Sequence, residues 1–459
     1  MATLQLYFLL FLLNPLTIQL KSQLLPITTT ISVLDFGATA DGITFDTVAI
    51  QSAINQISSS GGGTLNFPTN LSFLTATLFL KSGVTLEVEE GARIIAGVRE
   101  EDYPPEHRLW YLIVADGEKN VGIKGKGIID GRGEMFVQRK DPKKNIMVSW
   151  NQTGNCNGDE CRPKLIGFLD STGVKVEEIN LLQPALWCLH LVRCNDTVIG
   201  GVSINGDFNS PNNDGIDIED SNNTVITGCK IDTGDDAICP KTYTTPMHNL
   251  TVRNCWIKTK SSGVKFGSGS WFDFKNMLFD NLTIFDSHRG LALQIRDGGD
   301  VSNITFSNIE LRTRYYDPSW WGRAEPIYIT TCPRDQSSKA GSISNLRFVN
   351  ISAVSENGVF MSGSEGAELS DVSFVNISIT YQRWTDFAGG LDDYRPGCQG
   401  LVQHNSTPGI IMEYVSGFEI RHANMRWSHS SILNGWNNPL QFRSFTVSNL
   451  SFHDLNLSI

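Results

Sequence analysis

Hydrophobic and polar residues alternate in short segments that recur along the middle of the chain. Each segment starts with Asn or Asp, continues with alternating apolar residues, passes an Asn or Gly, and ends in another apolar pair. The copies start at Asp196, Asn223, Asn249, Asn276, Asn303, Asn345 and Asp371. Alternation with a period of two is typical of strands, and a spacing of 26–27 residues with one longer interval is typical of solenoids. The pattern predicts an all-β, right-handed parallel β-helix with one copy per coil. An antiparallel β-sandwich is the competing interpretation, although it would not favour so constant a period.

The segment before the repeats, residues 33–56, predicts a different element. A short amphipathic helix could start at Asp46 or Thr44 and would end before the three glycines at 61–63. Its inward residues would be Val48, Ile50, Ala53 and Ile54. Such a helix would cap the open end of a solenoid, which otherwise exposes strand edges and core.

Tetrapeptides within the coils form a second repeating column, which predicts another parallel sheet. The residues expected to point inward are Ile216, Ile238, Val264, Leu291, Ile327 and Val359. Their neighbours would point outward, with Asp217 and Lys265 at one position and Glu219 and Lys241 at the next. The residues that precede the strands and stack with one another would be Asp214, Asp236, Ser262, Gly290, Glu325 and Asn357. Because neighbouring strands lie about 4.8 Å apart, Asp214, Asp235 and Asp236 should meet on one patch.

Crowded carboxylates raise one another's pKa values, so that one can stay protonated while another is ionised. Hydrolysis of a glycosidic bond needs this division, because one acid protonates the leaving oxygen while another activates water. Two other interpretations stay open. The acids could lie on solvated Asp-Gly turns, or they could form a Ca²⁺ site, since hard carboxylate ligands cluster in the same way.

Composition narrows the choice of partner and compartment. With 459 residues, of which 40% are hydrophobic, the chain can bury a large core, and its net charge of −11 argues against binding to nucleic acid. Residues 1–23 contain a short apolar run typical of a signal peptide, or alternatively of a buried N-terminal segment, and residues 31–459 would form the β-helix domain. Secretion, a monomer and no membrane association of the mature form are therefore expected. Sequons such as those at Asn151, Asn249, Asn281 and Asn405 suit secretion, although their recurrence at turns also suits a structural role.

The nine cysteines show no paired metal-ligand spacing. Cys156 and Cys161 are close enough for a local disulfide, and the odd cysteine is expected to be a buried thiol.

An ordered set of motifs resembles glycoside hydrolase family 28, the polygalacturonases. NNDG at 212–215 and GDD at 234–236 resemble the NTDG and GDD motifs of that family. RPKLI at 162–166, PALWCLH at 184–190 and GKGIIDG at 125–131 resemble its RPxLI, SPxWxxH and GxGxIDG motifs. The resemblance implies that Asp235 is the general acid and that Asp214 and Asp236 activate water, with inversion at the anomeric carbon. It implies a pectin-type polysaccharide as substrate and no metal or organic cofactor.

Two motifs of the family are missing. Ser262 stands where its GHG motif has histidine, and ALQ at 292–294 stands where its RIK motif has the Arg and Lys that grip the galacturonate carboxylate. Lys241, Lys265 and Arg296 on the outward face could replace them, with Asn212 as a further substrate-binding residue. The same cations could instead be counter-ions for Asp217, Glu219 and Asp297.

The remaining candidates flank the acids. Aromatic residues in the long interval between Asn303 and Asn345, among them Trp320 and Trp321, could stack on pyranose faces or form a local core. His190 and Trp187 are expected to pack behind the sheet, and DDYRP at 392–396 to form a loop over the cleft.

The leading hypothesis is a secreted inverting hydrolase of pectin or a related acidic polysaccharide. Loss of the RIK motif keeps open a hydrolase of another glycan, such as rhamnogalacturonan. Loss of the histidine keeps open a β-helix that binds polysaccharide without cutting it, and a Ca²⁺-dependent lyase ranks last.

Overall fold

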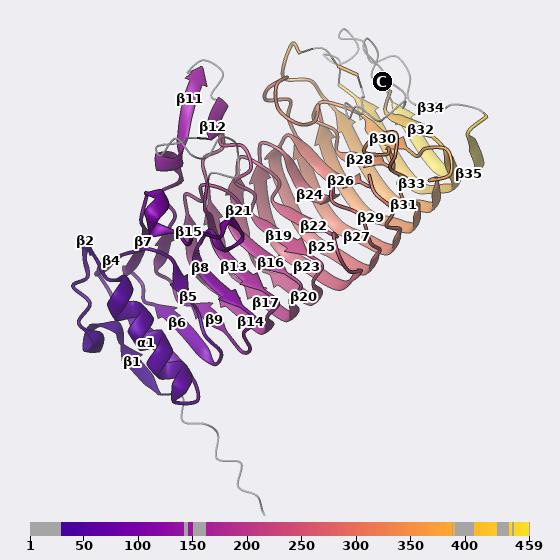
Figure 1. Ribbon diagram of the computed structural model, residues 1–459. Helices are drawn as coiled ribbons and strands as arrows, with labels where there is room; N and C mark the ends of the chain where they lie inside the picture. The colour runs from indigo at the N-terminus through magenta and orange to yellow at the C-terminus, as the bar shows by residue number, and fades with distance from the viewer. Residues whose placement is uncertain are drawn as a thin grey trace, which may run out of the picture.

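The computed structural model describes residues 29–141, 146–149, 162–387, 389–390, 408–428, 440–442 and 445–458. Its strands form an elongated stack of coils that runs from the N-terminal to the C-terminal end of the chain (Figure 1). All pairs in the two large sheets are parallel, for example Thr197 with Thr224 and Met277 with Ile304. The predicted right-handed parallel β-helix is therefore confirmed.

In the described part of the chain, two large sheets form the walls of the stack. The 12-stranded sheet consists of β5 (Leu78–Phe79), β8 (Tyr111–Asp116), β13 (Lys164–Leu169), β16 (Leu189–Val192), β19 (Ile216–Glu219), β22 (Ile238–Lys241), β24 (Ser262–Gly267), β26 (Arg289–Gln294), β28 (Ile327–Thr330), β30 (Val359–Ser362), β32 (Ile410–Glu413) and β34 (Leu440–Phe442). The 21-stranded sheet consists of β1 (Thr30–Ser32), β2 (Asp41–Phe45), β3 (Gly63–Phe67), β4 (Ser72–Thr75), β6 (Val84–Val88), β7 (Arg93–Ala96), β9 (Gly122–Lys124), β10 (Ile128–Asp130), β14 (Thr172–Glu177), β15 (Asn180–Leu182), β17 (Asn195–Gly200), β18 (Ser203–Asn205), β20 (Asn222–Thr227), β21 (Lys230–Thr233), β23 (Met247–Thr259), β25 (Phe274–Ser287), β27 (Val301–Thr313), β29 (Ile343–Ser355), β31 (Leu369–Tyr381), β33 (Val415–Trp427) and β35 (Val447–Ser458).

The smaller elements lie toward the N-terminal end. They are the helix α1 (Thr47–Ser59), the antiparallel pair β11 (Val137–Asp141) and β12 (Ile146–Ser149), and the 3-10 turns η1 (Val33–Phe36), η2 (Glu100–Asp102), η3 (His107–Leu109) and η4 (Gly133–Phe136). The predicted capping helix is confirmed, since Asp46 precedes it and Ile50, Ala53, Ile54 and Ile57 are buried. Val48 was wrongly expected inside. Its side chain is 80% exposed, because position 48 faces the side of the helix opposite the buried residues.

Asparagines at the corners hold successive coils in register. The repeating segments pair as aligned, and from β23 onward each forms one long strand that bends at a residue with positive φ, such as Asn254 or Asn281. The amide of Asn281 donates to Oδ1 of Asn254 at 2.8 Å, and that of Asn249 donates to Oδ1 of Asn223 at 3.0 Å. Asn249 and Asn281, both in sequons, therefore link successive coils, which is the structural role that their recurrence at turns predicts.

The core lies inside the coils and contains a column of phenylalanines contributed by the repeats. Phe279 stacks on Phe306 with ring centroids 4.9 Å apart, and Phe306 stacks on Phe348 at 5.1 Å. Equivalent residues of neighbouring repeats thus fill one continuous apolar interior, which stabilises the stack and fixes its register.

The second column of the sequence is the 12-stranded sheet. Ile216 pairs with Ile238, Val264 with Leu291, and Ser262 with Arg289. The pre-strand column therefore contains Arg289, and the prediction of Gly290 there was one residue off. Arg289 lies two residues before Leu291, as Ser262 lies two residues before Val264, so the spacing is constant and the segment at 291–294 had been aligned one residue late.

Several predictions fall outside the described residues. They are the signal peptide at 1–23, the disulfide between Cys156 and Cys161, the sequons at Asn151 and Asn405, and the loop at 392–396. Cys332 takes part in a disulfide, whereas Cys188, Cys194, Cys229, Cys239 and Cys255 are buried free thiols. No helix among the described residues is long and apolar enough to cross a membrane.

Candidate active site

Three acids meet where the coils of β19 and β22 enter the 12-stranded sheet. Asp214 precedes β19, and Asp235 and Asp236 precede β22, the adjacent strand. The three side chains are 4% exposed or less. One carboxylate oxygen of Asp214 and one of Asp236 lie within 4.8 Å of each other. The predicted convergence of the acids is therefore present in the structure.

The turns that carry the acids are held by buried polar side chains. Oδ1 of Asn213 accepts hydrogen bonds from the backbone N–H groups of Gly234 (2.8 Å) and Asp235 (3.1 Å). A Cβ at Gly234 would lie 2.2 Å from the carbonyl oxygen of Ser210, so only glycine fits there. Arg162 is 1% exposed and donates to the carbonyls of Ala185 and Pro211. The NNDG and GDD turns are thus bonded into one rigid unit.

Asp235 combines burial with a nearby negative charge. Its Oδ2 accepts from the backbone N–H of Asn212 at 2.8 Å, and its Oδ1 accepts from that of Asp236 at 2.8 Å. Burial first, and the charge of Asp236 second, raise the pKa of Asp235 from 3.8 to about 7. The side chain therefore keeps its proton under mildly acidic conditions, as a general acid must.

Asp236 lies in the opposite electrostatic setting. Its Oδ2 accepts a hydrogen bond from the ammonium group of Lys265 at 2.5 Å, and its Oδ1 accepts from Ser261 Oγ at 2.7 Å. Burial acts to raise the pKa of Asp236, but the charge of Lys265 and these hydrogen bonds outweigh it, so the pKa is lowered. The pKa values of the two neighbouring acids thus shift in opposite directions, because Lys265 is hydrogen-bonded to Asp236 but acts on Asp235 only through its charge.

Asp214 lies next to a buried ion pair between Lys241 and Asp217. The ammonium of Lys241 contacts Asp217 directly and lies 3.9 Å from Oδ2 of Asp214. Burial, followed by the charges of Asp217 and Asp235, raises the pKa of Asp214 well above its ordinary value. Its buried Oδ1 has no hydrogen-bond partner among the described residues.

The predicted cations have different positions in the structure. Lys265 lies at the acids, with its side chain 17% exposed, and Asn212 lines a hollow beside them. Lys241 is 6% exposed and paired with Asp217, which matches the alternative role of counter-ion. Arg296 is fully buried and donates to the carbonyl of Cys332, so its expected place on the open face was wrong. It lies after the end of β26.

The donor set does not suit calcium. In the part of the chain that the structure describes, one group of three potential metal ligands occurs, formed by Asp214, Asp236 and Cys239. Calcium takes six to eight oxygen ligands. Burial raises the pKa of the Cys239 thiol well above its ordinary value, and the thiol donates to the carbonyl of Gly267. Asp236 is already neutralised by Lys265, so the geometry disfavours the Ca²⁺ interpretation.

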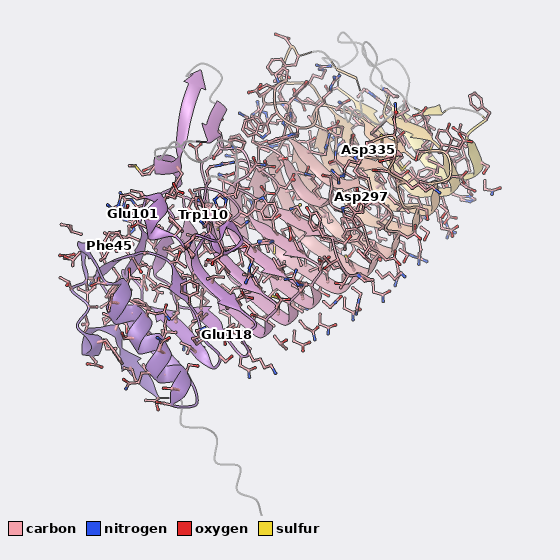
Figure 2. The ribbon with its side chains drawn as sticks, in the orientation of Figure 1. Phe45, Glu101, Trp110, Glu118, Asp297 and Asp335 are labelled. Atoms are coloured by element: carbon pink, nitrogen blue, oxygen red, sulfur yellow. The ribbon has the colours of Figure 1, made fainter. Side chains whose placement is uncertain are left out.

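Hollows flank the acids on both sides along the axis of the stack. The N-terminal hollow, of about 420 Å³, is lined by Trp110, Lys164, Trp187 and Asn212 among others. The C-terminal hollow, of about 330 Å³, is lined by Arg289, Trp320, Trp321, Arg323 and Glu325 among others. Trp110 lies toward the N-terminal end of the stack and Asp297 farther along it (Figure 2). A chain of sugars could thus extend past the acids in both directions.

Sequence reasoning gave no role to Arg162, Asn213 or Arg289. Arg162 and Asn213 belong to the quoted motifs RPKLI and NNDG, and this membership was the available signal. Arg289 was missed because Gly290 had been predicted at its place in the column.

His190 packs and hydrogen-bonds as expected, since its Nδ1 lies 2.7 Å from the Tyr111 hydroxyl and its ring packs edge-on against Trp187. Its expected place behind the sheet was wrong, because His190 pairs with Asp217 in the outward column, where its Nε2 lies 3.4 Å from Glu219, and Trp187 lines the N-terminal hollow.

Comparisons with known proteins point to one family. The model of glycosyl hydrolases family 28 matches residues 55–388. A probable polygalacturonase of Vitis vinifera is 27% identical over 311 residues, which cover 61% of this chain and 60% of that protein. Exopolygalacturonase B of Aspergillus niger is 26% identical over 310 residues, which cover 60% of this chain and 65% of that protein. The chain thus spans less than two thirds of the length of these relatives.

Solved structures show the same fold. The exopolygalacturonase of Thermotoga maritima has a TM-score of 0.67 at 23% identity, covering 85% of this chain and 91% of that one. The family 28 exopolygalacturonase of Yersinia enterocolitica has a TM-score of 0.64 at 17% identity, covering 92% of this chain and 78% of that one. Because the family model covers well over half of the sequence, the chain belongs to the glycosyl hydrolases of family 28.

Proposed function

We propose that the protein hydrolyses glycosidic bonds in an acidic, pectin-type polysaccharide, with Asp235 as the general acid. The observation that carries this proposal is the unequal environment of Asp235 and Asp236. The pKa of Asp235 is raised to about 7 by burial and by Asp236, whereas Lys265 keeps Asp236 ionised. An acid that holds its proton beside a base that has lost its own is the pair that glycoside hydrolysis requires.

In the proposed mechanism, Asp235 donates its proton to the leaving glycosidic oxygen. A water molecule attacks the anomeric carbon from the opposite face, and Asp236 accepts the proton that this water loses. The carboxylate oxygens of Asp214 and Asp236, within 4.8 Å of each other, can both hold one water at ordinary hydrogen-bond lengths of about 2.8 Å. Direct attack by water predicts inversion at the anomeric carbon, in agreement with the resemblance described above.

The proposed substrate is acidic because of the relatives and because of the charges around the acids. The relatives reported above are named polygalacturonases. Lys265 lies at the acids and is part-exposed, and Asn212 lines the N-terminal hollow, so we propose both as substrate contacts. Ala292 and Gln294, at the positions of the missing RIK cations, are fully buried. These positions therefore offer no cation to a galacturonate carboxylate, and we keep another glycan such as rhamnogalacturonan as the second candidate substrate.

The test is a reducing-end assay on polygalacturonan and rhamnogalacturonan, with ultraviolet absorbance and proton NMR of the first product formed. New reducing ends of inverted configuration without an unsaturated product are expected. An unsaturated product would indicate a lyase, and binding without cleavage would indicate a carbohydrate-binding protein. We also propose that the protein is secreted and acts as a monomer. Detection of the protein in culture medium and light scattering test these two statements.

A further inference from the structure

The long insert between the repeats that start at Asn303 and Asn345 reaches back to the turn that carries the acids. It leaves β27 after Thr313 and returns to the 12-stranded sheet at β28. Between these two points, Nε1 of Trp320 donates to the carbonyl oxygen of Gly234 at 3.0 Å, in the turn before β22. In the sheet, β24 and β26 lie between β22 and β28. Coils of a solenoid contact mainly their direct neighbours, so the insert adds a bond between coils that are not adjacent.

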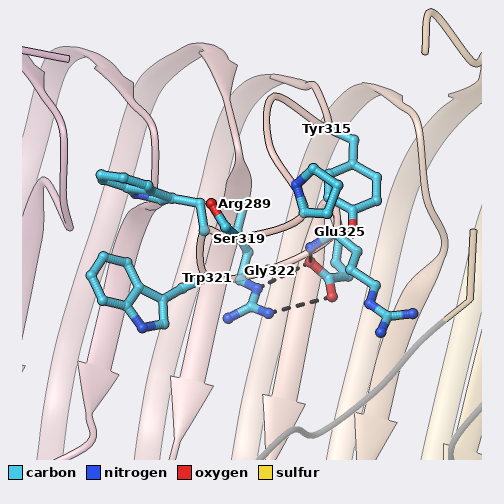
Figure 3. A pocket seen from close by; sticks show the side chains of 9 residues that line it. Arg289, Tyr315, Ser319, Trp321, Gly322 and Glu325 are labelled. Carbon is cyan, nitrogen blue, oxygen red and sulfur yellow. Dashed lines mark hydrogen bonds and ion pairs between the residues drawn. The ribbon is translucent and has the colours of Figure 1, made fainter. Parts of the chain in front are cut away.

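The C-terminal end of the insert is anchored by a buried ion pair. Nε and Nη2 of Arg289 lie 3.1 and 3.3 Å from the two carboxylate oxygens of Glu325, and both residues are 1% exposed or less. Figure 3 shows Trp321 on one side of Arg289 and Glu325 on the other. The insert passes so close to the guanidinium that a Cβ at Gly322 would lie 3.2 Å from Cζ of Arg289. The chain next to Trp320 is therefore fixed to the sheet.

The Trp320 side chain is itself held in place. It is 7% exposed, and Nζ of Lys260 lies 4.2 Å from the centre of its ring and 3.6 Å from the carboxylate of Asp317. Closer to the start of the insert, the hydroxyl of Tyr316 donates to the carbonyl of Asp286 at 2.7 Å. Trp320 is thus part of a local core, and its indole N–H reaches the turn from a rigid support.

The peptide group between Gly234 and Asp235 is hydrogen-bonded on both of its polar sides. Its carbonyl oxygen accepts from Trp320, and its N–H, which belongs to Asp235, donates to Oδ1 of Asn213 at 3.1 Å. Because a peptide group is planar, bonds to its oxygen and to its nitrogen fix the orientation of the whole plane. On the other side of Asp235, the carbonyl accepts from Oγ1 of Thr233 at 2.8 Å. The direction in which the Asp235 side chain leaves the backbone therefore depends on Trp320 as well as on Asn213.

We propose that Trp320 is a positioning residue for the general acid, whose indole N–H holds the Gly234–Asp235 peptide so that the Asp235 carboxyl points at the leaving glycosidic oxygen. Asn213 comes from the NNDG motif, whereas Trp320 comes from the insert, so the insert completes the support of the acid. A misplacement of about 1 Å can lower the rate of an enzyme about 100-fold, so a single bond at this peptide matters for turnover. This inference rests on the proposed function, since it takes Asp235 to be the proton donor.

The experiment compares two leaving groups, because proton donation matters for a sugar alkoxide and much less for a nitrophenolate, which is stable as an anion. The substrates are polygalacturonan and the para-nitrophenyl glycoside of trigalacturonate. Trp320→Phe keeps an aromatic ring beside Lys260 and removes the N–H. It should lower kcat on polygalacturonan about tenfold with KM unchanged, and lower release of nitrophenol by less than about twofold. Asp235→Asn should show the same selectivity with a larger loss on polygalacturonan.

A second measurement is independent of catalysis. The backbone N–H of Asp235 should exchange with solvent deuterium faster in Trp320→Phe than in the wild-type protein, followed by mass spectrometry, because its peptide has lost one of its two bonds. The matched control is Trp256→Phe in β23, which removes an indole that stacks on Phe285 in the other sheet and should change neither the two rates nor the exchange. Melting temperatures of all variants establish that they are folded.

Equal losses on both substrates in Trp320→Phe, no loss on either, or a higher KM at constant kcat would overturn the positioning role. Unchanged exchange at Asp235 would overturn it as well. If Asp235→Asn keeps its turnover on polygalacturonan, the proposed function is wrong, whereas the expected result for Asp235→Asn beside an unaffected Trp320→Phe refutes only the role of Trp320. A wild-type protein that cleaves neither substrate would refute both.

Discussion

The outer faces of the two large sheets differ in whether their charged and polar side chains are exposed or buried. On the 21-stranded sheet, buried and accessible residues alternate along strands such as β31, and its corners expose rows of asparagines. On the 12-stranded sheet, strands such as β22 and β28 are buried on both faces, and the outward side carries Asp217, Lys241 and Arg289 at 6% exposure or less. Charge taken out of water destabilises a fold unless it is paired.

One face therefore holds the coils together, whereas the other carries the candidate active site. The repeats already close the core and set the register through the 21-stranded sheet, without any buried charge. Some buried charges near the other face hold turns, as Asp220 does by accepting hydrogen bonds from the backbone N–H groups of Tyr243 and Thr244. The charges around Asp235 and Asp236 also shift the pKa values of these two acids in opposite directions. Perturbed pKa values in a hollowed surface are typical of functional sites.

The largest effect is expected from Asp235→Asn. Loss of the general acid should lower kcat by about 10²–10⁴-fold without a loss of stability, measured by the reducing-end assay and by thermal unfolding. Asp280→Asn, on the solvated sheet, is the matched control and should leave kcat unchanged. An Asp235→Asn variant with wild-type turnover would show that the proton comes from another group.

The next largest effect is expected on stability, from removing one partner of a buried ion pair. Lys241→Met leaves the fully buried Asp217 without its cation and should lower the free energy of unfolding by about 3–5 kcal/mol. Lys275→Met removes half-exposed Lys275 from Asp273 and should leave the free energy of unfolding almost unchanged, because water screens an exposed ion pair. Denaturant titration compares the two variants, and addition of Asp217→Asn to Lys241→Met should restore much of the loss. Equal losses for the two lysines would contradict the contrast between the faces.

Lys265→Met should act through Asp236. Without the ammonium group, burial is opposed only by weaker influences such as the hydrogen bond from Ser261, so the pKa of Asp236 rises and the base becomes protonated at higher pH. The acidic limb of the pH profile of kcat/KM should move upward, with the largest loss of activity at low pH. Lys265→Arg should keep the limb in place. A change in KM alone, with an unshifted limb, would mean that Lys265 serves substrate binding only.

The smallest effect is expected on the asparagine rows. Asn281→Ala loses the hydrogen bond to Asn254 and places a side chain with a Cβ at a φ of 52°, which together should lower the unfolding free energy by about 2 kcal/mol. Asn281→Gly keeps the backbone conformation and should cost about half as much. Activity should be unchanged in both. A loss of activity in the folded variants would show that this face does more than hold the coils.

The fold could be predicted from sequence because its signals are local and repeated. Apolar alternation fixes the strands, and the positions of Phe279, Phe306 and Phe348 fix how coils stack. Val48 and Gly290 were misplaced because each assignment depends on a single residue position. In a helix one residue changes the face, which put Val48 on the wrong side, and in the strand column one residue separates Gly290 from Arg289, the correct member.

The acids were predicted well and their partners less well. Asp214, Asp235 and Asp236 belong to short motifs, so the register alone brings them together. Lys241 and Arg296 are outward in the pattern, but burial depends on what loops cover, and the pattern contains no such information. The contact of Trp320 with the turn of the acids could not be predicted without the path of the insert, since Trp320 and Gly234 are 86 residues apart.

The most direct test is the pH dependence of kcat/KM for the wild-type protein on polygalacturonan. Asp235 must be protonated and Asp236 ionised, so activity should fall as pH rises through about 7 and should fall at low pH only below the ordinary aspartate pKa of 3.8. Such a profile, with a plateau between the two limbs, is the predicted result. Activity that stays constant or increases as pH rises through 7 to 9 would contradict the division of protons between these two neighbouring acids.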